Sequence, residues 1–457
     1  MRDIKITNFR CYAEKTMEFR PGINLLIGDN SVGKTSLLGA CNLVINSFFC
    51  GYSGEYTKWK SPTDEDFREV KTDDIQLPEE LPINITFHLD EDDCPPIVLP
   101  DGQVISLQAR KSMDDPSALP DLVFEKKSKK NARNLVTGLK PLRDFAAACQ
   151  KYSHSIENNT ATQHYALPVY AYYTTEDIHS IRKFDREKKN FKKYPQKPTF
   201  GYSESHDSKG LLDCWITRLL TLREAKKGEV EVRCVTEALK KALGQDGCGI
   251  IADIDIRPID GKVYFTFCDG REVHTDLLSD GYRRLVSIIT DIAFRCALLN
   301  KTMFGEEAYL HSHGTVIIDE IDEHLHPELQ AKVLDALHST FPHIQFIVST
   351  HSPLVISSVK KSDENIVYKL AYEDGVYTHE VYDTYGLDAN SVITLMGALV
   401  RPDAVERQIK HVRSLLSDMK IEEAKQALQE LVTITDPDQV DLVQLRAMLN
   451  RLEILGR

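Results

Sequence analysis

Residues 25–36 read Leu25-Leu26-Ile27-Gly28-Asp29-Asn30-Ser31-Val32-Gly33-Lys34-Thr35-Ser36, and this stretch decides the fold. Its three leading apolar residues predict the end of a buried strand, and the glycine-bounded loop leads into an apolar helix that we expect to begin near Lys34. The loop fits the pattern G-x-x-x-x-G-K-[ST] of a phosphate-binding P-loop. Backbone N–H groups of such a loop, together with the positive end of the following helix, can surround a phosphate group.

This loop predicts a site for ATP and Mg²⁺. Lys34 would reach the β- and γ-phosphates, and the Thr35 hydroxyl would hold Mg²⁺. The alternative is an ordinary glycine turn between strand and helix, but such a turn does not require Lys-Thr at this offset. The residues expected to bind the nucleotide are Gly28, Asp29, Asn30, Ser31, Val32, Gly33, Lys34, Thr35 and Ser36.

A second apolar strand, followed by two carboxylates, lies far downstream. Thr315-Val316-Ile317-Ile318-Asp319-Glu320 has the form of a central parallel strand whose C-terminal edge faces a ligand. In this Walker B pattern Asp319 would bind the Mg²⁺ shell, and Glu320 would orient and activate the attacking water. A core strand that simply ends in a polar turn would read the same way, but the upstream P-loop favours the catalytic interpretation.

A third buried strand is predicted at residues 345–348, and it runs into Ser349-Thr350-His351. His351 therefore stands at the edge where a parallel sheet keeps its ligands, and its imidazole could hydrogen-bond a γ-phosphate or the attacking water. His324 and His326 lie between the two strands. Their spacing supplies no third ligand, so we do not expect a metal site there.

A helix entry precedes the Walker B strand. Ser279-Asp280-Gly281 opens a helix that we expect to run from about residue 280 to about residue 299. Free N–H groups at such an N-terminus can bind an anion, although Ser-Asp-Gly is also a routine helix cap. Whether this segment binds an anion or only caps the helix therefore depends on the neighbouring motifs.

The charge distribution bears on nucleic acid as a partner. The formal net charge of −13 over 457 residues argues against binding nucleic acid over the whole surface, but it permits a local basic groove. Residues 182–197 hold eight Lys or Arg, the first Arg182 and the last Lys197, against two acids. Phe184, Phe191 and Tyr194 are interleaved with them. This segment predicts either contact with DNA or RNA, through basic side chains on phosphates and aromatic rings that stack, or a solvated loop.

Composition indicates a cytoplasmic protein without a membrane partner. The apolar stretch at residues 37–50 is too short to cross a bilayer and is interrupted by Asn42 and Asn46. The N-terminal residues enter a strand-like pattern directly, with no signal-peptide pattern. Ten cysteines are scattered without C-x-x-C pairs, which is typical of buried reduced thiols.

We expect an α/β fold, a P-loop NTPase with a helical insertion and a helical tail. The expected parts are an N-terminal lobe (1–134), a mainly helical insertion (135–245), a C-terminal lobe (246–400) and a tail (401–457). The insertion includes a strand-like stretch at residues 167–173. The tail predicts three amphipathic helices, which either pack on one another or offer a surface to a partner, and we favour the partner.

The order of these motifs resembles ABC-type ATPase heads of the SMC and RecF group, as in bacterial AAA-family ATPases with an overcoming-lysogeny-like head. On this resemblance Asn8-Phe9-Arg10 is the N-terminal strand of the head, with Arg10 at the nucleotide. Residues 278–282 are the signature motif, Leu325-His326-Pro327 is the D-loop, and His351 is the switch histidine. The Mg²⁺-sensing glutamine of these heads is hard to place, with Gln76 a candidate.

The resemblance extends to solitary ATPases of bacterial defence operons, with the Septu type the nearest. Tyr172-Tyr173-Thr174-Thr175, Gly201-Tyr202, Trp215 and the tail after Tyr385-Gly386 are similar to them. The resemblance implies an ATP-sandwiched homodimer or higher oligomer. In it, Ser279-Asp280-Gly281 of one subunit closes on the γ-phosphate held by the opposite P-loop.

Two functions compete at this point. The first is a sensor or scaffold ATPase that controls a separately encoded nuclease effector in antiphage defence, because no nuclease motif follows His351. The second is a RecF-like repair clamp that binds DNA on the head. The basic segment favours the clamp, whereas the acidic total charge favours the scaffold.

Overall fold

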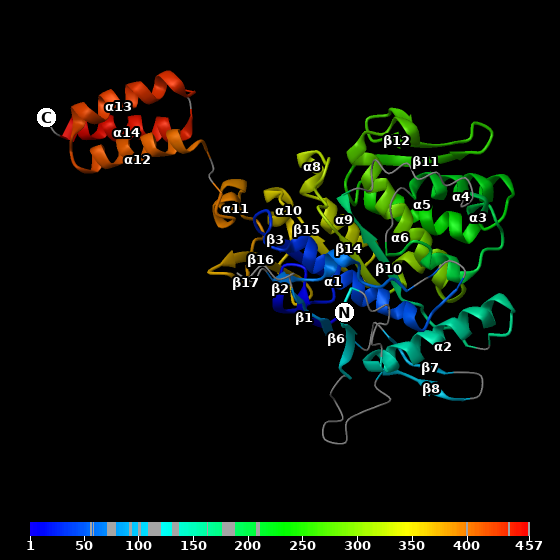
Figure 1. Cartoon of the computed structure of the whole chain (residues 1–457). Coiled ribbons are helices and arrows are strands. Elements are labelled where there is room, and N and C mark those ends of the chain that lie inside the picture. Colours follow the sequence, from blue (N-terminus) through cyan, green and yellow to red (C-terminus); the bar gives the residue numbers. More distant parts are fainter. Residues whose placement is uncertain are drawn as a thin grey trace. The chain divides into compact units, whose positions relative to one another are not determined.

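The structure is a computed structural model, and it describes residues 1–54, 57, 59–70, 79–90, 94–98, 102–107, 120–129, 137–161, 163–175, 188–206, 211–398, 401–436 and 439–455. The chain divides into two compact units, Met1–Leu387, here called the head, and Asp388–Arg457, here called the tail. Figure 1 shows the helices and strands of both units.

A six-stranded sheet carries the motifs of the head. The strand order is β10-β14-β15-β3-β16-β17, with bounds Val169–Tyr173, Gly314–Ile318, Ile344–Ser349, Ile23–Ile27, Ile366–Glu373 and Val376–Val381. The first five strands are parallel and β17 runs antiparallel to β16. All residues of the first four strands are buried, which is typical of a parallel sheet covered on both faces. The prediction of an α/β P-loop fold is confirmed.

Strand β10 lies in this central sheet. The sequence places residues 167–173 inside a helical insertion, but β10 pairs with the Walker B strand β14, with Tyr173 opposite Ile318. Its five residues, VYAYY, are all buried. β-branched and aromatic side chains favour a strand that is covered on both faces, so this segment belongs with the sheet.

A second, antiparallel sheet has the order β2-β1-β6-β9, with bounds Tyr12–Glu18, Asp3–Phe9, Ile83–His88 and Leu122–Lys126. Burial alternates along β6 and β9, so one face of the sheet packs on the core. Three smaller sheets complete the described strands. They are β4-β5 (Glu69–Val70, Glu79–Glu80), β7-β8 (Ile97–Val98, Val104–Ile105) and β11-β12-β13 (Ile251–Arg257, Lys262–Phe267, Glu272–His274).

The head helices are α1 (Lys34–Ser47), α2 (Lys140–Glu157), α3 (Lys188–Phe191), α4 (Leu212–Glu224), α5 (Glu229–Leu243), α6 (Asp280–Phe304), α7 (Ala308–His311), α8 (Pro327–Gln330), α9 (Val333–Thr340) and α10 (Pro353–Ser358). Helices α4, α5 and α6 lie side by side (Figure 1). None of the described helices combines the length and the apolar character that a bilayer crossing requires.

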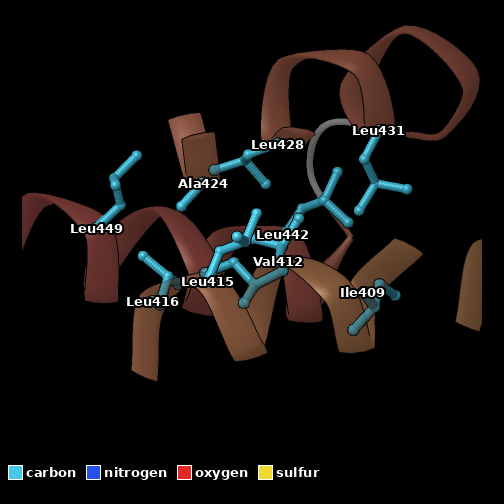
Figure 2. Close-up of a cluster of buried hydrophobic side chains, with 10 residues drawn as sticks. Ile409, Val412, Leu415, Leu416, Ala424, Leu428, Leu431, Leu442 and Leu449 are labelled. Atoms are coloured by element: carbon cyan, nitrogen blue, oxygen red, sulfur yellow. The ribbon is translucent and has the colours of Figure 1, made fainter. Parts of the chain in front are cut away.

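The tail consists of α11 (Ala389–Leu395), α12 (Asp403–Ser417), α13 (Ile421–Ile434) and α14 (Val440–Leu455). Helices α12, α13 and α14 enclose an apolar core, and Figure 2 shows its side chains pointing toward one another. The core residues are Ile409, Val412, Leu415, Leu416, Ala424, Leu428, Leu431, Leu442, Leu445 and Leu449. The three predicted amphipathic helices therefore pack on one another, and a partner for the tail stays a prediction.

Candidate nucleotide site

The loop between β3 and α1 has the backbone of a tight glycine-bounded turn. Gly28 (φ 141°), Ser31 (φ 68°) and Gly33 (φ 94°) all have positive φ values. A Cβ atom at Gly28 would lie 2.4 Å from the Leu370 carbonyl oxygen, and one at Gly33 would lie 2.4 Å from Tyr12 Oη. Both positions therefore require glycine.

Lys34 begins α1, and its side chain folds back over the loop. The Nζ atom donates hydrogen bonds to the carbonyl oxygens of Gly28 and Asp29, each at 2.8 Å. Burial lowers the pKa of the Lys34 ammonium, and the negative charges of Asp319 and Glu320 oppose that shift. The Walker B carboxylates therefore stabilise the charged form of the Lys34 ammonium. This is expected if the two motifs contact the same phosphate.

The outer residues of the loop face solvent. Asp29, Asn30, Ser31 and Thr35 are exposed. Tyr12 stabilises the loop from the protein side, because its Oη atom donates a hydrogen bond to the Gly33 carbonyl at 3.0 Å. The backbone N–H groups at the start of the 14-residue helix α1 are the donors a phosphate would use.

The Walker B strand ends beside β15. Ile318 pairs with Val348, so Asp319 and Ser349 follow at neighbouring positions. The Ser349 hydroxyl donates to the Asp319 carboxylate, and the Glu320 N–H donates to Ser349 Oγ at 2.8 Å. An oxygen donor set of the Thr35 hydroxyl and the Asp319 carboxylate fits Mg²⁺, which prefers oxygen ligands.

Glu320 occupies an unusual electrostatic and conformational position. Its φ is 50°, a left-handed backbone that side-chain-bearing residues rarely adopt. Burial and the neighbouring Asp319 charge raise the pKa of the Glu320 carboxyl, whereas His351 lowers it. A carboxylate with a raised pKa suits a general base, and these three side chains influence one another at the same edge of the sheet.

The His351 segment is tied to the loop that follows Walker B. The Thr350 hydroxyl donates to Asp322 Oδ1, and the His351 N–H donates to the same oxygen at 3.4 Å. His351 itself is half-buried. Lys34, Asp319, Glu320 and His351 therefore share one edge of the central sheet, and their catalytic roles stay predictions.

The Ser279-Asp280-Gly281 segment forms the start of the 25-residue helix α6. Ser279 and Asp280 are exposed, while Gly281 is buried. A Cβ atom at Gly281 would lie 2.3 Å from the carbonyl oxygen of His324. The first turn of α6 therefore packs directly on the main chain of the segment that leads into Leu325-His326-Pro327.

Arg10 lies beside α1. Its Nε atom forms an ion pair with Asp66 at 2.9 Å, and its guanidinium lies against Gly39 of α1. A role for Arg10 at the nucleotide stays a prediction. Gln76 lies outside the described residues.

The basic segment is described only from residue 188, so Phe184 and residues 182–187 lie outside the description. Phe191 was expected to be available for stacking, but it is buried, with ring centroids 4.9 Å from Phe200 and 4.8 Å from Trp215. Arg218 holds the segment by donating to the carbonyl oxygen of Phe191 at 3.1 Å. The expectation for Phe191 is therefore wrong, because an arginine of α4 fixes the chain over the core.

Sequence reasoning missed three residues of this site. Tyr12 braces the P-loop, Ser349 bridges Asp319 and Glu320, and Arg284 of α6 donates to the Asp319 carbonyl at 2.7 Å. Ser349 directly precedes Thr350-His351, which was a usable signal. Tyr12 and Arg284 reach the site through tertiary contacts alone.

Two family models match overlapping parts of the chain. Residues 1–209 match the "AAA ATPase domain" model. Residues 150–357 match an "AAA domain" model whose description also names the AbiEii toxin and a Type IV TA system. The first match contains the P-loop, and the second contains α6, Walker B and His351.

Two relatives and one solved structure are also similar. The "Retron Vc95 probable ATPase" of Vibrio cholerae serotype O1 biovar El Tor is 36% identical over 152 residues, which is 32% of this chain and 29% of the relative. The "Septu protein PtuA" of Bacillus mycoides (strain KBAB4) is 30% identical over 141 residues, 31% of this chain and 19% of the relative. The crystal structure titled as the SmcHead bound to the C-winged helix domain of ScpA is 17% identical, with 84% of this chain and 97% of that chain covered and a TM-score of 0.42.

The matched segments span less than a third of either relative. The two family models nevertheless cover the P-loop, the Walker B strand and the helix between them. Together with the relatives named as retron and Septu proteins, they show that residues 1–357 of this chain are similar to AAA-family ATPase domains.

Proposed function

We propose that this ATPase binds and hydrolyses ATP with Mg²⁺ and uses the cycle to control a separate nuclease effector in antiphage defence in the cytoplasm. The observation that carries the proposal is the meeting of Lys34, Asp319, Glu320 and His351 at one edge of the central sheet. The retron and Septu relatives support the defence setting.

The chemistry follows from the geometry of this edge. The Lys34 ammonium, which donates to two loop carbonyls, is within reach of phosphates bound over the same loop. Thr35 and Asp319 would hold Mg²⁺, which when bound neutralises phosphate charge. Glu320 would orient the attacking water and accept its proton, and His351 would hydrogen-bond the γ-phosphate.

A dimer completes the proposal. Ser279 and Asp280 are exposed at the N-terminus of α6, where free N–H groups favour an anion, and in a dimer they would close on the γ-phosphate of the opposite subunit. The Glu320→Gln variant should retain ATP and elute as a dimer in size-exclusion chromatography with light scattering. A monomer at saturating ATP would contradict the dimer.

A mixing experiment tests whether the site is shared between subunits. Lys34→Ala and Ser279→Arg should each be inactive alone, but a heterodimer contains one P-loop and one signature segment that are both intact and face each other. Mixing the two variants should therefore restore up to about a quarter of the wild-type ATPase rate, since about half of the dimers are mixed and each has one working site. No recovery on mixing would refute the composite site.

The effector is tested in cells. Phage plating should fall when the chain is expressed with its neighbouring genes, and Lys34→Ala should abolish that protection. Removal of the neighbouring genes should also abolish it, because the proposal places the toxic chemistry on a separate protein. Protection by this chain alone would refute a separate effector.

A second candidate, a DNA-binding clamp, is favoured by one observation. Lys192-Lys193 and Lys226-Lys227 are exposed, and the ring of Tyr194, which is 42% exposed, lies with its centroid 5.9 Å from Lys227 Nζ. Tyr194 also contacts the position of Gly228. Within the described part of the chain, these four lysines have no ion pair, and lysines around an exposed ring suit a single strand.

Salt dependence separates the clamp from the scaffold. The isolated chain should bind a single-stranded oligonucleotide with an affinity that falls steeply with salt if it is a clamp. Replacing the four lysines by Gln should then flatten this dependence, whereas replacing Lys360 and Lys361, which pair with Asp335 and Asp383, should not. Absence of binding supports the scaffold.

A further inference from the structure

The peptide group that joins Asp319 to Glu320 is held on both sides. Its carbonyl oxygen accepts a hydrogen bond from Arg284 Nη2 at 2.7 Å, and its N–H donates to Ser349 Oγ at 2.8 Å. The Glu320 backbone has a φ of 50°, which persists only where surrounding contacts impose it. Arg284 and Ser349 therefore set the direction in which the Glu320 side chain leaves the main chain.

Arg284 lies in the second turn of α6 and is almost wholly buried, with 3% of its side chain exposed. Its Nη1 atom forms an ion pair with Glu323, and its Nε atom has no hydrogen-bond partner among the described residues. Burying a guanidinium carries a desolvation cost, and an apolar side chain would fill the same space without it. The polar contacts to the Walker B loop are what an arginine adds at this position.

A second contact lies one turn earlier on the same helix. Gly281 approaches the His324 carbonyl so closely that a Cβ atom would lie 2.3 Å from it. The start of α6 is thus fastened to residues 319–324 at two points, through Gly281 and through Arg284. Ser279 and Asp280 immediately precede these points and are exposed.

We propose that Arg284 is a positioning residue that couples the Ser279-Asp280-Gly281 segment to the orientation of Glu320. This inference rests on the proposed function. When the start of α6 engages a phosphate on the opposite subunit, its movement is carried by the Arg284 guanidinium to the carbonyl of Asp319. The Glu320 carboxylate then takes the direction needed for the attacking water only in the closed dimer.

The first test separates binding from turnover. Arg284→Met removes the hydrogen bond and the ion pair while keeping a long side chain in the core. We expect kcat to fall about 100-fold, because a small misplacement of a catalytic group has an effect of that size. The Kd for ATP should stay within about twofold, since the P-loop is untouched. Arg283→Met is the matched control, because its partner Asp213 lies on the surface, and it should turn over at the wild-type rate.

The second test asks whether Arg284 acts through Glu320. In single-turnover assays, adding Arg284→Met to Glu320→Gln should slow hydrolysis by no more than about twofold beyond Glu320→Gln alone, because the group that Arg284 positions is already lost. A full 100-fold further loss would overturn the inference. Unchanged kcat in Arg284→Met would also overturn it.

A third variant covers the case in which Arg284→Met does not fold. Glu323→Gln weakens the ion pair with Arg284 but leaves the guanidinium in place, and it should reduce kcat about tenfold with ATP affinity unchanged. Wild-type turnover in Glu323→Gln would then overturn the inference. Failure of the proposed function looks different: the wild-type chain would not hydrolyse ATP, or Glu320→Gln would turn over normally.

Discussion

The interiors of the head and the tail differ in chemistry. Among the described residues, the head buries acidic and basic side chains within its core, and these are Lys15, Lys34, Asp66, Lys126, Arg218, Glu231, Arg284, Asp291, Arg295 and Asp319. The buried side chains of the tail, within its described part, are apolar (Figure 2). Among the described residues, the buried charged side chains therefore lie in the head, and their positions depend on hydrogen bonds and charge.

Each buried charge in the head requires specific partners. Asp291 of α6, for example, accepts hydrogen bonds from Tyr173 (2.6 Å), Trp215 (2.6 Å) and Arg295 (2.8 Å), which come from β10, α4 and α6. A charge buried without such partners would be strongly destabilising. The tail core requires only volume and helical spacing, so its sequence has fewer constraints. The comparison predicts that substitutions at the nucleotide site of the head alter chemistry, whereas substitutions in the tail core alter stability alone.

The largest expected effect tests the head. Lys34→Ala should weaken ATP binding by at least about 100-fold. The variant would lose the charge-assisted hydrogen bonds that we expect Lys34 to donate to the β- and γ-phosphates, each of about 1.5–3 kcal/mol. Isothermal titration calorimetry measures the change. Lys126→Ala is the control, because Lys126 is also buried but donates to the Pro62 carbonyl. Unchanged ATP affinity in Lys34→Ala would contradict the P-loop assignment.

Glu320→Gln should leave ATP binding intact and lower kcat by about 10²- to 10⁴-fold, the usual contribution of a general base. The amide preserves the size of the side chain, so the unfolding temperature should change little. Steady-state phosphate release measures kcat. A kcat equal to that of the wild type would remove Glu320 from its assigned role.

The tail is tested by Leu442→Ala. Leu442 is fully buried in the three-helix core, and its truncation should destabilise the tail by about 2–5 kcal/mol. Denaturant unfolding followed by circular dichroism measures the loss. Val443→Ala, at a neighbouring half-exposed position, should change stability by less than about 0.5 kcal/mol. If Leu442→Ala also weakened ATP binding, the division of roles between the two units would be wrong.

The smallest effect concerns pH. Burial lowers the pKa of Lys15 from its usual 10.5 to about 8. Between these values the unfolded chain binds more protons than the folded one, so this group makes stability rise with pH. In Lys15→Met the slope of the free energy of unfolding against pH should be smaller than in the wild type, by at most about 1.4 kcal/mol per pH unit. Urea unfolding between pH 7.5 and about 9.5 tests this, and equal slopes in the two proteins would contradict it.

Local sequence predicted the elements that carry the motifs. The apolar run before Gly28, the carboxylates after Ile318 and the periodicity of the tail each depend on neighbouring residues, and the corresponding β3, β14 and α12–α14 are present. Within the site, the sequence predicted the meeting of Lys34, Asp319, Glu320 and His351, because the C-terminal ends of parallel strands share an edge.

Tertiary contacts account for what the sequence did not predict. β10 joins β14 through pairing between residues more than 140 positions apart. Phe191 is buried because Arg218, 27 residues away, holds its main chain. Between β14 and β15 the chain forms two helices, α8 and α9, and Lys332 between them donates to the Cys248 carbonyl at 3.3 Å. Polarity and spacing within a segment carry no information on such partners.

Because Glu320 has a left-handed backbone conformation, stability and activity favour different residues at this position. An L residue with this φ loses about 1 kcal/mol relative to glycine. Glu320→Gly should therefore relieve strain while removing the carboxylate. A selection for thermal stability alone would enrich this replacement, whereas a selection for phage resistance would eliminate it. Opposite outcomes in the two selections would mark position 320 as one that function, and not folding, maintains.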